Sequence, residues 1–362
     1  IWRFRPESER LEVFARGMVN PWGFALNDWG QGFGTDGAGG AGPHDVFPGS
    51  AFGTAVGAPR VLGGLLPGKP KNTAAEFLTG RHLPAHWQGS LVANDFRANR
   101  TVRYELEEAG SGFRAKEVET VLHSDHRSFR PVDLKMGPDG ALYVVDWYNP
   151  IIDHGEVDFH HPQRDKSHGR IWRITATGRS LVEPPTIAGA PVAELLSLLE
   201  SPEQATRVRA NRELAARPCQ GLMQPVRAWL AGLDREDPDF ERHRLEGLWL
   251  LMAHRAAPPK LLEEILASPD PRARAAAARA LGNWQSRAGS LSPVELLARA
   301  IDDEHPRVRL EAVCALRAIG SLEAASVALR ALDRDVDSNL DFALEMVVRE
   351  TRDAWLPAMQ RG

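Results

Sequence analysis

Residues 130–147 read RPVDLKMGPDGALYVVDW and are followed, after a long polar loop, by GRIWRITATG at 169–178. Apolar residues alternate with polar ones on both sides of PDG at 138–140, a pattern typical of a tight turn between antiparallel strands. The same pattern occurs in NPWGFALNDWGQGFGTDG at 20–37 and, in part, in WQGSLVANDFRANRTVRYEL at 87–106. Small antiparallel sheets that recur along a chain indicate a β-propeller with radial blades; a β-sandwich is the alternative.

These stretches supply about three blades, whereas a closed propeller needs roughly four to eight. The chain also begins at Ile1, within what the pattern predicts to be a strand. We therefore expect residues 1–180 to be the C-terminal part of a longer propeller. The chain is expected to be a fragment, and no signal sequence is visible in it.

The connections between the predicted strands carry the most polar and glycine-rich segments. In a blade with strands a to d, the d–a and b–c connections emerge on the same face. Five segments are expected to converge there: 20–21, 36–48, 96–100, 129–130 and 149–168. Long loops gathered on one face of a rigid scaffold are the usual place of a binding or catalytic site.

Two of these loops contain groups that bind ions in other proteins. The loop 149–168 carries His154, His160, His161 and His168 among several carboxylates, but it lacks the HxH and HExxH spacings. It is either a metal or cofactor contact or a solvated loop held by salt links. The segment GTDGAGGAGPHDVFPG at 34–49 lacks the P-loop pattern. Its carbonyls could face Ca²⁺, or it could be a turn-rich crossing.

The second half of the chain repeats a short helical pattern. The copies are RVRANREL at 207–214, RHRLEGLWL at 242–250, RARAAAARAL at 272–281, RVRLEAVCAL at 307–316 and SNLDFALEMVV at 338–348. Proline stands shortly before three of them, as expected near helix starts. Two helices per repeat predict an α-solenoid over 192–362 that resembles HEAT repeats, joined by a linker at 181–191. The arginines of the repeats are expected to link neighbouring repeats, and Cys219 and Cys314 to pack as small apolar groups.

Composition supports this division and excludes several classes of protein. The first 180 residues hold 24 of the 32 glycines, whereas the remainder holds 32 of the 48 alanines. Lys plus Arg number 44 against 48 Asp plus Glu, which gives a net charge of −4 and no electrostatic footprint for nucleic acid. Two cysteines without CxxCH exclude a disulfide framework and c-type haem in this chain. No apolar run is long enough to span a membrane.

With these segments in view, residues 1–179 resemble the glucose/sorbosone dehydrogenase-like propellers, and more narrowly the membrane-bound dehydrogenase family in which such a propeller precedes HEAT repeats. The resemblance rests on FGTDGAGG, VFPGSAFGTAVGAPRVL, TGRHLPAHWQGSLVANDFRANR, FRPVDLKMGPDGALYVVDWYNPIIDHGEVDF and RDKSHGRIWRITATGR. It implies a six-bladed propeller that carries pyrroloquinoline quinone (PQQ) and Ca²⁺ on its loop-bearing face. It also implies export to the periplasm or a membrane-associated location.

The resemblance assigns expected roles to four residues. Asn20 matches an asparagine beside the quinone, and the Gly37 carbonyl matches a calcium ligand. Arg97 and Arg130 match basic residues that face the quinone and one of its carboxylates, a pairing that guanidinium groups suit. Otherwise Arg97 is a solvated loop arginine, and Arg130 forms a salt link with Asp133 or Asp146. The other loop-face candidates are Asp36, His44, Asp146, Trp147, Tyr148, His154 and His168.

The sequence departs from the family pattern at Val19, where relatives have arginine, and at Ala38, where they have proline. The general-base histidine is expected in N-terminal blades that this chain lacks, so the fragment alone is expected to be inactive. The leading hypothesis is a quinoprotein-type dehydrogenase that oxidises a sugar or other alcohol. Its expected partners are an electron acceptor such as a cytochrome c and a protein bound on the HEAT surface. The alternatives are a non-catalytic module that binds a glycan or protein and, less favoured, a calcium-dependent propeller hydrolase.

Overall fold

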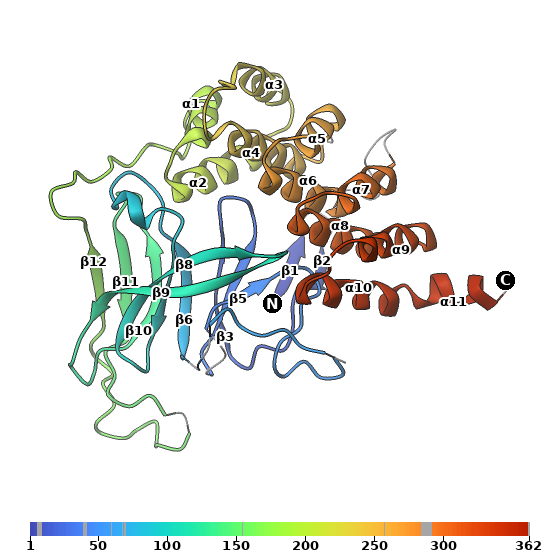
Figure 1. The fold of residues 1–362 in the computed structure, drawn as a ribbon. Coiled ribbons are helices and arrows are strands. Elements are labelled where there is room, and N and C mark those ends of the chain that lie inside the picture. The colour runs from blue at the N-terminus through green and yellow to red at the C-terminus, as the bar shows by residue number, and fades with distance from the viewer. Residues whose placement is uncertain are drawn as a thin grey trace.

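In a computed structural model, the chain forms small antiparallel sheets followed by a stack of helices (Figure 1). The structure describes residues 1–5, 9–38, 42–58, 60–66, 68, 70–153, 155–256, 258–283 and 292–360. The last strand ends at Ile174 and the first α-helix begins at Val192. The segment expected to be a linker, 181–191, therefore lies between the strands and the helices.

The strands pair antiparallel in four sheets within the described ranges. The first sheet contains β1 (Trp2–Arg5) and β2 (Arg10–Val13), and the second contains β3 (Pro21–Leu26), β4 (Gly32–Asp36) and β5 (His44–Val46). The third contains β6 (Asn72–Phe77), β7 (Leu91–Asp95), β8 (Arg100–Ala109) and β9 (Gly112–His123). The fourth contains β10 (Pro131–Met136), β11 (Leu142–Asp146) and β12 (Arg170–Ile174). A short 3₁₀ helix, η2 (Ala85–Trp87), precedes β7.

The stretch 130–147 forms the antiparallel hairpin β10–β11 that its alternation predicts. Gly140 takes a φ of +79° in the turn, a conformation that glycine adopts without steric cost. The turn is closed by the Gly137 amide, which donates to the Ala141 carbonyl at 2.8 Å. Leu134 and Leu142 are fully buried, so the predicted apolar positions do face the interior.

The first strands of three successive sheets lie next to one another, β3 against β6 and β6 against β10. Their backbones approach closely: a Cβ atom on Gly23 would lie 2.2 Å from the carbonyl carbon of Ala74. Hydroxyl groups also bridge the sheets, because Thr35 donates to the Ala74 carbonyl at 3.1 Å and Thr73 to the Pro131 carbonyl at 3.0 Å. The three sheets are therefore joined at their first strands, with their later strands farther out.

The helices form two rows (Figure 1). The inner row, nearer the sheets, contains α2 (Gln204–Ala215), α4 (Phe240–Ala253), α6 (Pro271–Asn283), α8 (Pro306–Ile319) and α10 (Ser338–Glu350). The outer row contains α1 (Val192–Ser197), α3 (Met223–Gly232), α5 (Pro259–Leu266), α7 (Pro293–Ile301) and α9 (Leu322–Leu329). The chain also has η3 (Leu198–Glu200), η4 (Arg330–Asp333) and the terminal α11 (Arg352–Gln360). All five repeated sequence cores lie on the inner row.

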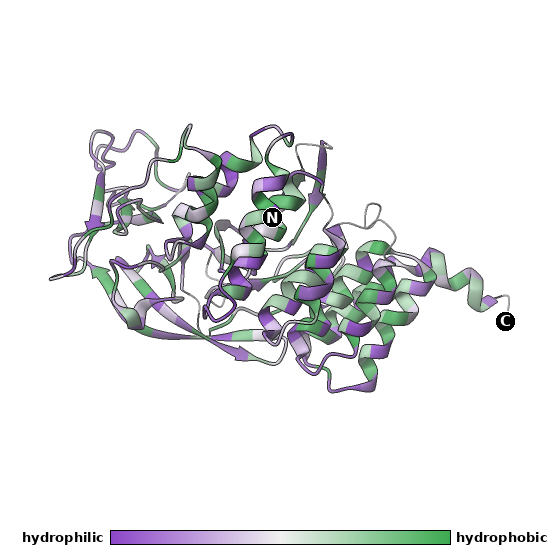
Figure 2. Cartoon of the chain, turned by 90° about the horizontal axis from the view of Figure 1, so that it is seen from above, coloured by the Kyte–Doolittle hydropathy of each residue, from purple (hydrophilic) through white to green (hydrophobic). Residues whose placement is uncertain are grey.

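Local sequence accounts for the helix ends. In α8, the His305 ring accepts the Arg307 amide at the N-terminus, Pro306 occupies the first turn, and Gly320 ends the helix with a φ of +73°. Apolar and polar segments alternate along the helices, as the colouring of Figure 2 shows. No helix in the described ranges is long and apolar enough to cross a membrane.

The inner row is fixed to the sheets by arginines, and we call this contact the junction. Arg207 of α2 pairs with Asp28 of the β3–β4 turn and with Glu246 of α4 at 3.0 Å. Arg279 of α6 donates to the carbonyls of Trp29 at 3.1 Å and Gly30 at 2.7 Å. The arginines therefore do more than the predicted linking of neighbouring repeats, because they also bind the sheets.

Further contacts extend the junction along the later helices. Arg307 of α8 donates to the Gly112 carbonyl at 2.8 Å, and its guanidinium lies 3.7 Å from the centre of the Phe113 ring. Phe47 packs edge-on against Phe342 of α10, with ring centres 6.2 Å apart. The junction therefore combines apolar burial with paired charges.

The cysteines behave differently from each other. Cys314 is buried in the helical core, and this burial raises the pKa of its thiol to about 12. The expectation of a packed apolar group is wrong for Cys219, which is exposed beyond the end of α2.

Candidate functional site

The second strand of each of three sheets ends in an aspartate: Asp36, Asp95 and Asp146. Each aspartate pairs across the sheet with the first residue of the first strand: Pro21, Asn72 and Pro131. In all three sheets, the amide after the aspartate donates to the carbonyl before the first strand. The pairs are Gly37–Asn20 at 2.9 Å, Phe96–Lys71 at 3.3 Å and Trp147–Arg130 at 2.9 Å. We call the edge formed by residues 19–22, 36–38, 96–100, 126–130 and 146–148 the loop face.

The Asp36 carboxylate holds the first of these strand ends in place. It accepts the amides of Val19 at 2.8 Å, Asn20 at 3.2 Å and Ala38 at 2.8 Å. Both residues that depart from the family pattern, Val19 and Ala38, thus contact Asp36 through backbone amides, which any residue but proline supplies. Asp36 is buried and acts as a cap for two segments of backbone.

Asp146 caps backbone amides in the same way at the equivalent end of β11, and it has two side-chain partners in addition. One carboxylate oxygen accepts the amides of Arg130 at 2.8 Å and Tyr148 at 2.9 Å. The other accepts Arg170 Nε at 2.8 Å and Trp172 Nε1 at 3.2 Å. The carboxylate is therefore fully engaged in fixing the loops around it.

Side-chain contacts connect the three strand ends into one continuous surface. Asn20 and Trp22 flank Gly37, because a Cβ atom there would meet both side chains within about 3 Å. Trp22 in turn stacks on Phe96, with ring centres 6.0 Å apart. Farther along, Arg130 donates to the Asn99 side chain, which joins the second strand end to the third.

Arg130 is a half-buried cation with spare hydrogen-bonding capacity. Its Nη1 donates to Asn99 and to the Phe129 carbonyl at 2.9 Å, while its Nε is buried and has no partner among the described residues. Burial lowers the pKa of the guanidinium, against the opposing effect of the Asp146 charge. Within the described residues, Arg130 forms no ion pair with Asp133 or Asp146, so the alternative salt-link interpretation is not supported.

Arg97 lies in the turn between β7 and β8 with its side chain exposed. In the part of the chain that the structure describes, it makes no hydrogen bond or ion pair. Arg97 therefore lies on the loop face with its side chain open to solvent.

Aromatic rings and a second arginine lie at the far end of the loop face. Tyr148 has a positive φ of +55°, a conformation that is strained for a tyrosine and is held here by its surroundings. Its ring stacks on His126 at 5.5 Å and lies 4.1 Å from the Arg170 guanidinium. His168 touches the same ring edge-on at 5.9 Å and is bonded to Asp165, whose pKa is lowered to about 2 by amide hydrogen bonds and by His168.

The remaining candidates are divided between the core and the exterior. His44 lies in β5 instead of the expected loop, packs edge-on against Phe52 at 4.9 Å, and has its pKa lowered by burial. Trp147 is 43% exposed beside Tyr148. His154 lies outside the described residues.

Sequence reasoning did not single out Asn99, His126 or Arg170. Asn99 carries a positive φ of +57°, a conformation that asparagine tolerates well, so ANR after a strand was a usable indication of a turn. No pattern in the sequence indicated that His126 would stack on a tyrosine 22 positions later. Among the described residues, no cluster of three or more His, Cys, Asp or Glu side chains is placed to hold a metal ion.

Family models match two separate segments of the chain. Residues 257–349 match HEAT repeats, which agrees with the predicted nature of the helical part. Residues 71–178 match a domain of unknown function, DUF7133, which includes the second and third strand ends of the loop face. No curated protein matches the chain.

Solved structures of glucose dehydrogenases resemble part of the chain. One, from Thermus thermophilus and proposed to be an oxidoreductase (glucose dehydrogenase), is 24% identical over 45% of this chain and 47% of its own, with a TM-score of 0.34. Two further glucose dehydrogenases are 25% and 27% identical over 48% and 37% of this chain and 49% and 43% of their own, with TM-scores of 0.33 and 0.30. The chain spans about half the length of these proteins or less.

Proposed function

We propose that the chain is part of a quinoprotein-type dehydrogenase that oxidises a sugar or another alcohol at the loop face. In this proposal, the sheets β3–β5, β6–β9 and β10–β12 are successive blades of a propeller. The side-by-side order of β3, β6 and β10 supports it, because the first strands of propeller blades lie nearest the central axis. The proposal is also supported by the equivalent loops of these three sheets, which meet at one edge, the loop face.

The observation that carries the proposal is the state of Arg130. A half-buried guanidinium costs free energy unless an anion or several acceptors compensate it. Arg130 has a buried Nε with no acceptor and no carboxylate partner in the described residues, although Asp146 stands close by. PQQ carries three carboxylates, and a planar guanidinium binds carboxylate well. The donors at this site therefore fit an anionic ligand.

In the proposed enzyme, bound PQQ would supply a hydride acceptor for the alcohol carbon. Arg130 would bind one cofactor carboxylate, and Asn99 would fix the direction of its guanidinium. Asn20 would lie beside the cofactor, and Arg97 could approach it from the exposed turn. Asp36 and Asp146 would hold the loops in position through their amide contacts, without contacting the reacting atoms.

The calcium prediction rests on the resemblance at Gly37. Around that residue, both Asp36 oxygens already accept backbone amides, and the Asn20 carbonyl accepts the Gly37 amide. The described residues therefore add no free carboxylate to the Gly37 carbonyl. Export to the periplasm, membrane association and an electron acceptor such as a cytochrome c likewise remain proposals drawn from the resemblance.

Binding of PQQ tests the proposal directly. Titration of the chain with PQQ, followed by tryptophan fluorescence, should show saturable binding that Arg130→Ala weakens at least tenfold and Arg130→Lys weakens less. Arg349→Ala, an exposed arginine of α10 paired with Glu345, serves as control and should leave binding unchanged. Absence of binding, or equal binding by Arg130→Ala, would overturn the proposal.

A second candidate function is a non-catalytic module that binds a glycan. Trp22 and Trp147, on the loop face, are 47% and 43% exposed, and exposed aromatic rings offer flat surfaces on which sugar rings can stack. Binding of a glycan panel without PQQ, lost in Trp147→Ala, would favour this candidate. The calcium-dependent hydrolase gains no support, since it needs converging carboxylates and those of Asp36 and Asp146 are occupied.

A further inference from the structure

The junction determines which helical surface is open to another molecule. The inner row packs on the sheets through Arg207, Arg279 and Arg307. A partner therefore meets the outer row, which points away from the sheets (Figure 1). This inference is independent of the proposed function.

A groove of about 900 Å³ lies between α3, the start and end of α4, and α5. We call it the basic groove. Its apolar lining includes Leu230, Leu233, Phe240, Leu251 and Leu261. None of these leucines and aromatic residues is strongly exposed, so together they form a recessed apolar floor. The groove is large enough for several side chains of a bound peptide.

The charged lining of the basic groove is unbalanced. Four cations and one carboxylate line it: Arg227, Arg235, Arg244, Lys260 and Glu264. Glu264 is already paired with Arg244 at 3.3 Å and lies 3.9 Å from Lys260, and Glu241 also binds Arg244 at 3.1 Å. Arg227 and Arg235 are exposed and form no hydrogen bond or ion pair within the described residues, even though Asp234 and Glu236 adjoin Arg235 in sequence.

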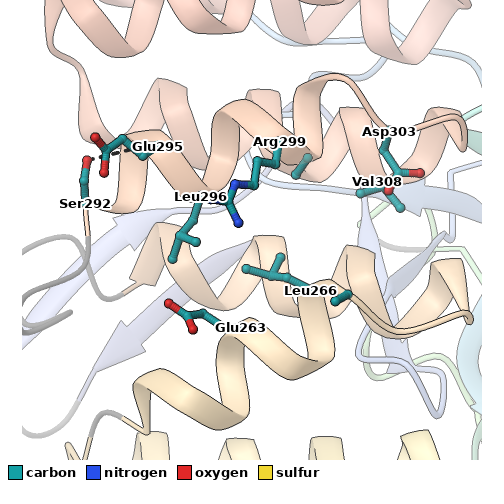
Figure 3. Close-up of a pocket in the computed structure, with 10 residues that line it drawn as sticks. Glu263, Leu266, Ser292, Glu295, Leu296, Arg299, Asp303 and Val308 are labelled. Atoms are coloured by element: carbon teal, nitrogen blue, oxygen red, sulfur yellow. Dashed lines mark hydrogen bonds between the residues drawn. The ribbon is translucent and has the colours of Figure 1, made fainter.

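A second groove, of about 440 Å³, lies on the opposite side of α5, against α7 (Figure 3). We call it the acidic groove. Glu263, Glu295 and Asp303 line it with a single lining cation, Arg299, although the Asp303 carboxylate is already paired with Arg274 at 2.7 Å. The two grooves share Ala267 but present opposite charge. Adjacent surfaces of opposite sign discriminate between partners, because the wrong charge is repelled.

We propose that the basic groove binds an acidic segment of a protein partner, with apolar side chains of that segment inserted between α3 and α5. The apolar floor would provide most of the affinity through burial. Arg227 and Arg235 would bind the partner's carboxylates and set its direction. The acidic groove would exclude the same segment from the neighbouring surface.

Peptide selection on the full chain tests this proposal even though the partner is unidentified. A displayed library of random 16-residue peptides is selected on the immobilised chain, and the enriched peptides are synthesised and measured by fluorescence anisotropy. Enriched peptides should combine Asp or Glu with Leu, Phe or Trp. Their binding should weaken at least tenfold in the double variant Arg227→Glu/Arg235→Glu and should fall as salt rises.

Arg299→Glu in the acidic groove is the matched control, because it reverses one exposed arginine on the outer row but leaves the basic groove intact. It should change the dissociation constant less than twofold. All variants are checked by circular dichroism and thermal unfolding, and both arginines of the double variant are exposed, so folding is expected to be retained. The proposal is overturned if no peptide is enriched, if enriched peptides lack an excess of acid, or if the double variant binds them as well as the unmodified chain.

Discussion

Arginine side chains have different partners at the junction and on the loop face. At the junction, Arg207 is almost fully buried and has carboxylates from two directions. On the loop face, Arg130 is half-buried with an unused Nε, and Arg97 is exposed and unpaired in the described structure. Both regions are rich in arginine, and Arg170 on the loop face is paired with Asp146, but Arg130 and Arg97 have no carboxylate partner among the described residues.

This difference distinguishes two roles of an arginine, one structural and one in ligand binding. A buried and compensated arginine has completed its interactions within the chain, so its removal leaves uncompensated partners and destabilises the fold, and it has little left for a ligand. An arginine with free donors contributes little to stability and is available to bind an anion. The comparison predicts that substitutions in the two regions will affect different measurements.

The largest loss of stability is expected from Arg207→Ala. This change leaves Asp28 and Glu246 with uncompensated charge at the junction and should cost about 3–5 kcal/mol. Urea unfolding, followed by circular dichroism, measures the change in the free energy of unfolding. Arg209→Ala, an exposed arginine of the same helix, is the control and should have little effect. A loss below about 1 kcal/mol for Arg207→Ala would contradict the proposed difference between the arginines of the junction and those of the loop face.

A smaller loss is expected from Asp146→Ala. Removing this carboxylate leaves the amides of Arg130 and Tyr148 and the Arg170 side chain without their acceptor, at a cost of about 2–4 kcal/mol. Asp95→Ala is the matched change at the equivalent strand end, where, in the part of the chain that the structure describes, the carboxylate has Arg100 at 3.6 Å as its only ion-pair partner. Its loss should stay below about 1 kcal/mol in the same unfolding assay. Equal losses would show that the amide contacts of Asp146 add nothing.

A pH dependence is expected from Asp45, which faces Arg307 and Glu311 at the junction. Burial raises its pKa from the ordinary 3.8 to about 7, with Arg307 opposing the shift. Between those two pH values the folded chain holds a proton that the unfolded chain has released, so stability falls as pH rises from about 4 to about 7 and levels off above.

Asp45→Asn removes this titration. We expect the melting temperature of the unmodified chain to lose roughly 2–4 °C over that interval relative to Asp45→Asn. Thermal unfolding at a series of pH values measures the difference between the two curves. Parallel curves would mean that Asp45 does not titrate in this range.

The smallest effect on stability is expected from Arg97→Ala, which removes no contact in the described structure. Its melting temperature should equal that of the unmodified chain, while any change in PQQ affinity would mark it as a ligand contact. A clear drop in melting temperature would instead place Arg97 with the structural arginines of the junction.

Local patterns in the sequence were sufficient to predict the individual elements. Alternating residues around Gly140 indicated the hairpin β10–β11, and the repeats placed the five inner helices, because period and turn chemistry are short-range properties. How the helices meet the sheets could not be predicted. Arg207 and Asp28 are 179 positions apart, and nothing in either neighbourhood specifies the other.

The candidate site was predictable in position more than in role. The loops 36–48 and 149–168, which follow the strands ending at Asp36 and Asp146, were expected on one face, and side-chain contacts connect the ends of those strands. The carboxylates of Asp36 and Asp146 bind backbone amides, however. Such contacts cannot be predicted from the sequence, because almost every residue has an amide. His44 was misplaced because three residues of its glycine-rich loop form the short strand β5.

Because the inner row of helices packs on the sheets, the two parts should stay together when the chain is cleaved between them. The connection between β12 and α1 is largely exposed, and such segments are where proteases cut most readily. A cut there would remove only one covalent link, whereas Arg207, Arg279, Phe47 and their partners would remain in place. The two pieces would therefore migrate together under native conditions and part only in denaturant, so a nicked preparation and an intact one would look alike until they are unfolded.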